Sequence, residues 1–236
     1  MMGLMDAVRG AFGLLFNGDP VLWRIVWISV STSVLGLLIA APFAVVGGYA
    51  IAMTQFRGRR VVIWLVQAAL SLPTVLIGLL LYMILSRHGP MGGLQWLFSQ
   101  PGIVAGQVVI ALPVLLAFTL AAVQAADPRL AETAIAHGAS PWRVMSTLLY
   151  EVRFGVMAAI ISGFGRVISE VGCAMMVGGN IAGETRTITT AIALETSKGE
   201  FAQGIALGVV LVTIALAMNG AMMVLQGDAH AARGRG

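Results

Sequence analysis

The sequence predicts an all-α integral membrane protein. Apolar residues make up 58% of the 236 residues and charged residues 10%, whereas a typical soluble domain is roughly 25% charged. Four stretches lack Asp, Glu, Lys and Arg, and each exceeds the about 20 residues that a membrane helix needs. They cover residues 25–56, 61–86, 88–126 and 201–227. These observations exclude a soluble globular protein.

Residues 1–20, which precede the first stretch, contain too few consecutive apolar residues to cross a bilayer. Residues 1–20 contain one short apolar run, residues 10–16, which is flanked by charged side chains. We expect this N-terminal segment to form a helix that lies in the membrane interface. The first two spans then follow in residues 25–56 and 61–86.

The third stretch is too long for one helix. Its first part, residues 88–102, is rich in Gly and Pro, which predicts a loop and places the start of the third span near Ile103. Pro42, Pro73 and Pro113 each lie inside a predicted span and are expected to kink it.

A fifth span, which is the fourth in chain order, is predicted over residues 152–178, although it carries Arg166 and Glu170 near its middle. A charge at the centre of a bilayer costs on the order of 2.5 to 3.5 kcal/mol on insertion scales. We therefore expect this span to face protein or water, shielded from lipid by the other four.

The domain organisation follows from these spans: a transmembrane domain over residues 21–226 and a tail over residues 227–236. Lys and Arg are more numerous on the side that holds residues 55–60, the loop 127–143 with Arg153, and the tail, where eight lie against five on the other side. The positive-inside rule then places the N-terminus outside and the C-terminus in the cytoplasm. Arginines scattered at the edges of apolar runs suit a lipid bilayer, and we expect no nucleic-acid partner.

The chemistry-bearing residues exclude several classes of protein. Lys198 is the single lysine and lacks the glycine pattern of a phosphate-binding loop, so we expect no ATP hydrolysis by this chain. Cys173 is the single cysteine and the three histidines fall in loops or the tail, which predicts neither a metal site nor a resident cofactor. No catalytic residue is expected.

The loop of residues 127–143 is predicted to form two short helices. Asp127 is suited to cap a helix that begins at Pro128, and Gly138 is placed to end it. A second helix is expected to begin at Ser140 and Pro141 and to run into the fourth span. Such a hairpin on the positive side of the membrane could dock into a groove on another protein.

Glu132-Thr133-Ala134, Gly138-Ala139 and then Leu148-Leu149 resemble the EAA motif in the membrane subunits of ABC importers. The family pattern closes with Leu-Pro, where this chain has Tyr150-Glu151. The resemblance implies that the loop 127–143 is a coupling helix seated in a separate ATPase, with Glu132, Ala134, Gly138 and Ala139 as its coupling residues. An ordinary interfacial hairpin is the alternative interpretation of this stretch.

Further segments are similar to the molybdate and tungstate permeases. They are Ser71-Leu72-Pro73, residues 89–92, residues 165–172 leading to residues 178–181, and residues 187–196, the last of which is most like the tungstate branch. The resemblance implies the type I ABC importer transmembrane fold in a bacterial or archaeal membrane. It also implies a second copy of the chain in a homodimer, cytoplasmic ATPase subunits that bind ATP and Mg²⁺, and an extracytoplasmic oxyanion-binding protein.

Ser162, Arg166 and Glu170 are spaced by four residues, so on a continuous helix they share one face. With Ser169 and Asn180 they are the candidates for the translocation pathway. Two interpretations stay open: an ion pair that fixes helix packing, or a lining of the anion path. Gly178-Gly179-Asn180 is interpreted either as a helix cap or as a break that turns N–H groups toward a cavity.

Four threonines with Arg186 follow this segment, and they are expected either at an outer gate or binding-protein surface, or in a solvated loop. They are Thr185, Thr187, Thr189 and Thr190. The sequence thus predicts the permease subunit of an ATP-driven importer of tungstate, or of molybdate, working by alternating access. The alternative is an ATP-independent anion channel or secondary carrier.

Overall fold

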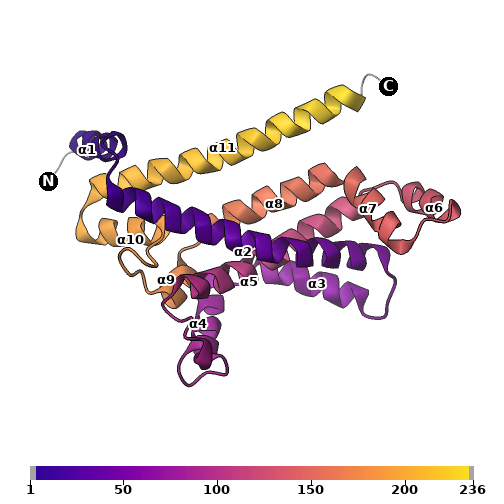
Figure 1. Cartoon of the computed structure of the whole chain (residues 1–236), viewed down its shortest axis with the longest axis horizontal. Coiled ribbons are helices and arrows are strands. Elements are labelled where there is room, and N and C mark those ends of the chain that lie inside the picture. The colour runs from indigo at the N-terminus through magenta and orange to yellow at the C-terminus, as the bar shows by residue number, and fades with distance from the viewer. Residues whose placement is uncertain (1–3, 234–236) are drawn as a thin grey trace. The chain divides into compact units, whose positions relative to one another are not determined.

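The computed structural model describes residues 4–233, with side chains described for residues 8–221 and 223. Over this range the chain folds into helices joined by turns and loops (Figure 1). The helices are α1 (Leu4–Phe16), α2 (Pro20–Met53), α3 (Arg59–Leu70), α4 (Thr74–Leu85), the 3₁₀ turn η1 (Gly92–Leu94), α5 (Gln100–Gln124), α6 (Pro128–Ala136), α7 (Pro141–Glu151), α8 (Arg153–Ile168), α9 (Gly172–Gly178), α10 (Ile188–Lys198) and α11 (Phe201–Arg233).

Three helices among the described residues are long and apolar enough to cross a membrane as single elements: α2, α5 and residues 201–221 of α11. Two bent pairs, α3 with α4 and α7 with α8, raise the number to five if each pair is one span. The expected helix in residues 1–20 is present as α1, and the expected loop before α5 runs from Ser86 to Ser99 around η1. Helices α2 and α5 continue past Pro42 and Pro113.

The second predicted span is not one helix. Helix α3 ends at Leu70 and α4 begins at Thr74, with Pro73 at the N-cap position of α4. Proline has no N–H to donate to the preceding turn, and its ring restricts the residue before it, so the helix ends ahead of it. The predicted kink at Pro73 is therefore a complete break.

The fourth predicted span, residues 152–178, is also wrong as a single helix. Helix α8 ends at Ile168 and α9 starts at Gly172. At its other end, α8 does not continue straight from α7, because the two helices are bent by 72° at Val152. The predicted tail begins inside α11, which continues to Arg233, and residues 234–236 lie outside the described residues.

The chain divides into two compact units. Unit 1 comprises residues 1–36, 73–110 and 164–217, and unit 2 comprises residues 37–72, 111–163 and 218–236. Four of these helices, α2, α5, α8 and α11, contribute residues to both units.

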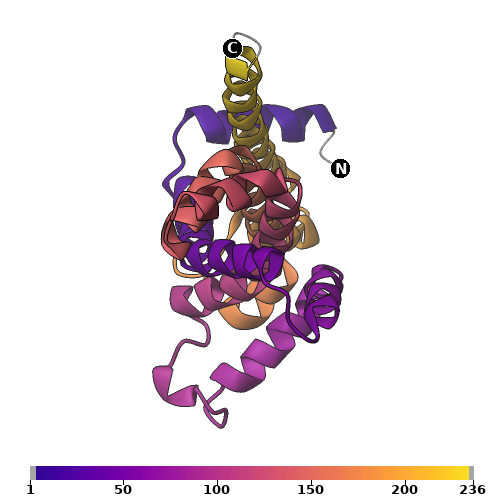
Figure 2. The same ribbon diagram turned by 90° about the vertical axis from the view of Figure 1, so that its right-hand side faces the viewer.

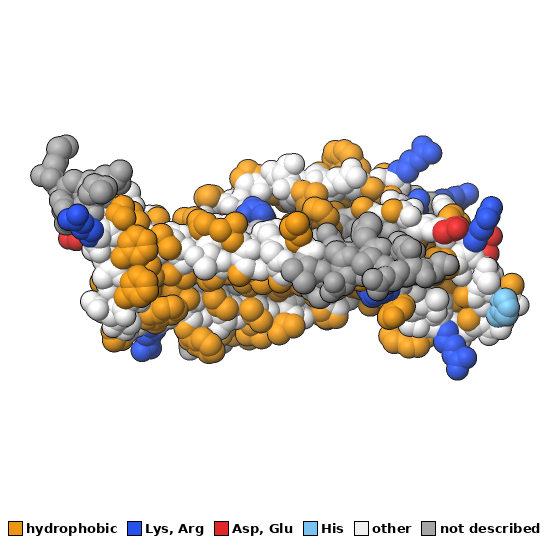
Figure 3. Space-filling view, turned by 90° about the horizontal axis from the view of Figure 1, so that it is seen from above, with side chains coloured by type: hydrophobic (Ala, Val, Ile, Leu, Met, Phe, Trp, Pro, Cys, Tyr) orange, Lys and Arg blue, Asp and Glu red, His pale blue; other side chains and the backbone are white. Residues whose placement is uncertain are grey.

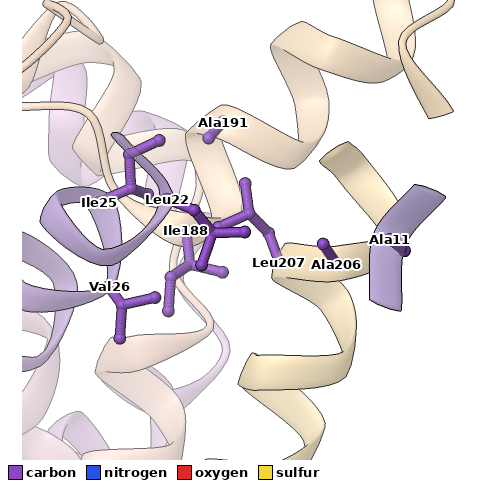
Figure 4. Close-up of a cluster of buried hydrophobic side chains, with 8 residues drawn as sticks. All are labelled: Ala11, Leu22, Ile25, Val26, Ile188, Ala191, Ala206 and Leu207. Carbon is purple, nitrogen blue, oxygen red and sulfur yellow. The ribbon is translucent and has the colours of Figure 1, made fainter. Parts of the chain in front are cut away.

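Unit 1 has an apolar core where α1, the start of α2, α10 and the start of α11 meet. Leu22, Ile25, Ile188 and Leu207 point toward one another in this core (Figure 4). Helix α1 lies across the first turns of α11 (Figure 2), and Ala11 is buried there. The N-terminal helix is thus fixed to unit 1, while its predicted place in the membrane interface stays a prediction.

Helices α4 and α9 of unit 1 approach each other closely. A Cβ on Gly78 would lie 2.8 Å from the Cα of Cys173, and a Cβ on Gly172 would lie 2.6 Å from Cγ2 of Val75. Because backbone atoms cannot move aside as side chains do, glycine at position 78 is required for this packing.

Unit 2 contains the second half of α2, α3, most of α5, α6, α7 and the first part of α8. A Cβ on Gly48 of α2 would lie 2.9 Å from Cβ of Thr119 on α5, so these helices also pack closely. A second core joins α6 and α7 to the end of α5 through Val123, Ala131 and Leu148, and Tyr49 and Ala52 of α2 pack against it. This core holds the short hairpin in place.

Hydrophobic side chains are widespread on the surface. In the face shown in Figure 3 they far outnumber the charged side chains. Large exposed residues include Trp27, Phe43 and Leu216. Such exposure is costly in water and favourable in lipid, as expected of membrane-spanning helices.

Candidate functional site

The first candidate site lies in unit 1 at the break between α8 and α9, residues 169–171, which we call the polar break. Nη1 of Arg166 donates to Oε2 of Glu170 at 3.0 Å. The side chain of Glu170 is 4% exposed and that of Arg166 is 38% exposed. The predicted ion pair is therefore present, but Glu170 stands beyond the end of α8 and not on a continuous helix with Arg166.

The polar break persists because side chains bond its backbone groups. Oε1 of Glu170 accepts from the N–H of Cys173 at 3.0 Å, in the first turn of α9. The hydroxyl of Thr189 donates to the carbonyl oxygen of Glu170 at 2.6 Å. A helix can be interrupted at membrane depth only where such partners replace the lost helical bonds. Glu170 thus joins α8, α9 and α10.

The predicted pathway residues differ in burial. Glu170 is buried and its carboxylate is occupied by Arg166 and Cys173. Arg166 is partly exposed, and Ser169 is exposed with its hydroxyl bonded to the carbonyls of Gly165 and Arg166. Ser162 is also exposed on α8. Their place in the translocation pathway stays a prediction.

The segment after α9 is a helix cap, which is the first of its two expected interpretations. Gly179 ends α9 with φ of +71°, and Asn180 follows with φ of +53°. The amide of Asn180 lies 3.5 Å from the carbonyl of Thr190, and its Oδ1 is buried with no hydrogen-bond partner. This orphaned oxygen is an acceptor, so it does not favour an anion.

The four threonines contradict the expected solvated loop and the expected exposed surface, while a place in an outer gate stays a prediction. Thr185, Thr187, Thr189 and Thr190 are all buried, so they form neither a solvated loop nor an exposed surface of the chain. Thr185 donates to the carbonyl of Gly178 and accepts from the N–H of Ile181. Thr187 and Thr190 cap the start of α10 reciprocally. Their hydroxyls bond backbone groups at the end of α9, at the polar break and at the start of α10. These bonds explain why four polar side chains are buried.

Charged residues near the threonines also have hydrogen-bond or ion-pair partners. Nη1 of Arg186 lies 3.9 Å from Oε1 of Glu195, which also accepts from Lys198 at 3.1 Å. Arg24 donates to the carbonyl of Gly183 at 2.8 Å. These bonds fix the segment between α9 and α10 to α2 and α10. Sequence reasoning missed Glu195, because its partner Arg186 belongs to another segment.

The second candidate site lies in unit 2 and is the hairpin of α6 and α7. The side chain of Asp127 accepts from the N–H of Arg129 at 2.9 Å, and Pro128 is the first helical residue, as predicted. Gly138 has φ of +75° just past the end of α6, and α7 begins at Pro141. The predicted extension of this second helix into the fourth span is instead bent at Val152.

The four predicted coupling residues all lie on this hairpin. Glu132 and Gly138 are exposed, and Ala134 and Ala139 are half-buried. A Cβ at Gly138 would meet no atom within 4 Å, so its requirement for glycine comes from the left-handed backbone alone. The hairpin is therefore a rigid projection that exposes Glu132 and Gly138.

Beside the hairpin lies an apolar groove, which the sequence did not predict. The last turns of α2 and residues 135–145 line it, with Tyr49, Met53 and Trp142 among its side chains. Its volume is about 760 Å³. A tryptophan in the predicted loop, Trp142, was the one signal in the sequence, and the helix beside it could not be inferred from the loop itself.

Comparison with known proteins places this architecture in a family. Residues 33–227 match the family described as "Binding-protein-dependent transport system inner membrane component". The tungstate uptake system permease TupB of Campylobacter jejuni is 36% identical over 92% of this chain and 90% of its own length. TupB of Peptoclostridium acidaminophilum is 32% identical, over 94% and 98%. The molybdenum transport permease ModB of Haemophilus influenzae is 32% identical, over 70% and 76%.

Solved structures share the fold. A bacterial ABC transporter that imports the acidic polysaccharide alginate matches with a TM-score of 0.71 at 20% identity, over 90% of this chain and 82% of that chain. The inward-facing methionine transporter MetNI matches with a TM-score of 0.67 at 19% identity, over 91% and 95%. The predicted type I importer fold is thus confirmed. The chain belongs to the inner-membrane components of binding-protein-dependent transport systems and is a multi-pass permease subunit of an ABC importer.

Proposed function

We propose that this permease subunit carries an oxyanion into the cytoplasm, with tungstate as the first cargo and molybdate as the second. The observation that carries the proposal is the 36% identity with a tungstate uptake permease over 92% of the chain. Molybdenum permeases are similar over a smaller part of the chain. The family match favours this function over an ATP-independent channel or carrier.

The energy for transport comes, in this proposal, from separate ATPase subunits that bind ATP and Mg²⁺. The hairpin of α6 and α7 supports this, because its exposed tip carries Glu132 and Gly138 on a core-anchored base. A rigid knob transmits a displacement without absorbing it. We place it on the cytoplasmic side, with the N-terminus outside, as the Lys and Arg distribution indicates.

Two copies of the chain form the pathway in this proposal. Ser162, Ser169 and part of Arg166 are polar groups exposed on α8 and directly after it, where the other residues beyond Arg153 are apolar or glycine. Polar groups at membrane depth need protein or water beside them, so a second copy would enclose them around an aqueous path. An extracytoplasmic binding protein would deliver the anion there. Closure of the ATPases would open this path outward, and ATP hydrolysis would reset it inward.

The cargo must be held weakly inside the membrane, because a deep energy well slows release. The ion pair of Arg166 with Glu170 meets this need. The carboxylate neutralises most of the arginine charge, and the exposed guanidinium edge leaves a modest attraction for an anion.

The cargo is tested by reconstituting the permease with its ATPase and binding protein in vesicles and measuring tungstate, molybdate and sulfate uptake. ATP-dependent tungstate uptake is expected, with molybdate second. Calorimetry of the binding protein with the same anions checks where selectivity resides. Uptake that proceeds equally well without ATP would contradict the proposal.

The role of the ion pair is tested by the double variant Arg166→Met with Glu170→Met, which removes both charges together. If the pair contributes to the anion path, double-variant protein that is folded and binds its ATPase loses most uptake. Arg87→Met, which removes an exposed cation outside the polar break, serves as the control and keeps uptake. Full uptake by the double variant would show that Arg166 and Glu170 contribute to helix packing and not to the anion path.

A further inference from the structure

We propose that the apolar groove between the end of α2 and the α6–α7 hairpin binds one acyl chain of an anionic phospholipid, whose headgroup contacts nearby arginines. The inference depends only on insertion of the chain in a membrane. It is independent of the cargo and of the ATPase contact.

The lining of the groove suits a hydrocarbon chain. It has eleven lining residues, none of them charged, and its volume of about 760 Å³ lies in the range of small-molecule sites. The hydroxyl of Thr54 is already bonded to the carbonyl of Ala50. The groove therefore offers contact to apolar groups and almost no unmet polar group.

The groove also lies at the depth where acyl chains meet headgroups. Helix α2 has 34 residues, so at 1.5 Å per residue it is about 51 Å long, against a hydrocarbon core of about 30 Å. Its last two turns, which line the groove, thus lie near the edge of the bilayer. Tyr49 and Trp142, both lining residues, are the aromatic types enriched at that depth.

Three arginines close to the groove in sequence are available to a headgroup. Arg57 and Arg60 follow the lining residue Thr54, and Arg143 stands between two lining residues of α7; all three are exposed. Arg59, in contrast, bonds the carbonyls of Ile51 and Ala52 and serves the end of α2. The nearest acidic side chain on α6 is Glu132, which does not line the groove. Positive charge therefore favours an anionic headgroup.

The experiment uses the full permease in nanodiscs, with and without its ATPase. The discs contain a trace of phosphatidylglycerol or phosphatidylcholine with a photoreactive diazirine on one acyl chain. After irradiation, labelled peptides are identified by mass spectrometry. We expect the anionic lipid to label residues 46–54 and 135–145 in preference to the zwitterionic lipid.

Two variants test the two halves of the site. Ala50→Trp fills the groove from an exposed position of α2 and should remove most labelling there, while Ala121→Trp, at an exposed position of α5 outside the groove, should keep it. Arg57→Gln should lower the preference for the anionic lipid about fivefold, the equivalent of about 1 kcal/mol for one basic residue near a membrane surface. Arg87→Gln, far along the chain from the groove, is the matched control.

Three results would overturn the proposal. Labelling of the groove that is no stronger than that of other exposed helix faces removes the site, as does labelling unchanged in Ala50→Trp. Labelling that disappears when the ATPase is bound assigns the groove to the protein partner. Uptake and ATPase association are measured on the same samples, so a failure of the lipid site is distinguished from a failure of the proposed transport function.

Discussion

At the scale of single residues, Glu170 connects more elements of the candidate site than any other predicted pathway residue. Its carboxylate bonds Arg166 and the N–H of Cys173, and its carbonyl oxygen accepts from Thr189. Three elements therefore depend on one side chain and its backbone. A buried acceptor in this position is more costly to remove than to keep, because its donors are left without partners.

We predict that Glu170→Ala lowers the free energy of unfolding by about 2 to 4 kcal/mol, because Arg166 and the Cys173 N–H lose their acceptor. Glu170→Gln keeps an oxygen for Cys173 and should lose less. Thermal or denaturant unfolding of the purified permease measures both. Glu184→Ala, at an exposed position, should change stability by less than about 0.5 kcal/mol. Equal losses in Glu170→Ala and Glu184→Ala would show that the polar break is not held as described.

Gly78 is a second residue whose effect can be stated in advance. Its added Cβ would lie 2.8 Å from the Cα of Cys173, so Gly78→Ala forces α4 away from α9. Overpacking of this kind costs about 1 to 3 kcal/mol. Gly208→Ala, where nothing lies within 4 Å, should be neutral or stabilising. The two melting temperatures, compared with that of the natural chain, decide whether this close approach exists.

At the scale of elements, the hairpin of α6 and α7 depends on the left-handed residue Gly138. We predict that Gly138→Val strains the turn and sharply lowers ATPase association and ATP-driven uptake, since a β-branched residue is a genuine outlier at positive φ. Gly138→Asn should keep most of both activities, because asparagine tolerates this conformation. Copurification of the ATPase with each variant is the measurement. If valine and asparagine behave alike, the turn geometry is not what the partner recognises.

The hairpin could be predicted from the sequence because its signals are local. Asp127, Pro128 and Gly138 cap, start and end α6 within a dozen residues. The break after α8 could not be predicted in this way. Its stability depends on Thr189, nineteen residues beyond Glu170, and the spacing of Arg166 and Glu170 alone suggested an unbroken helix.

The burial of the threonines was missed for a similar reason. Thr185 and Thr187 look like solvated loop residues, yet their hydroxyls bond the ends of α9 and α10 and replace water there. Pro73 correctly predicted where the second span is interrupted, but we predicted a kink and the helix breaks completely. A kink and a full break have the same local cause, so the sequence around the proline does not distinguish them.

At the scale of the whole molecule, the apolar surface, the long helices and the family match identify a membrane permease. The predicted number of spans depends on whether each bent pair crosses the bilayer once. If each does, the hairpin and the C-terminal end of α11 are on one side, and the segment between α9 and α10 is on the other. The coupling role of the hairpin requires that its side be the cytoplasm.

The most direct test of the central claim is therefore the sidedness of the hairpin. Cys173 is buried, so one introduced thiol can be followed against little background. Ser140→Cys on the hairpin and Ala182→Cys between α9 and α10 are exposed positions suited to a membrane-impermeant maleimide in intact cells. We predict labelling of Ala182→Cys in intact cells, and of Ser140→Cys only after the cytoplasmic side is opened. Labelling of Ser140→Cys from outside intact cells would contradict the assignment of the hairpin as the ATPase contact.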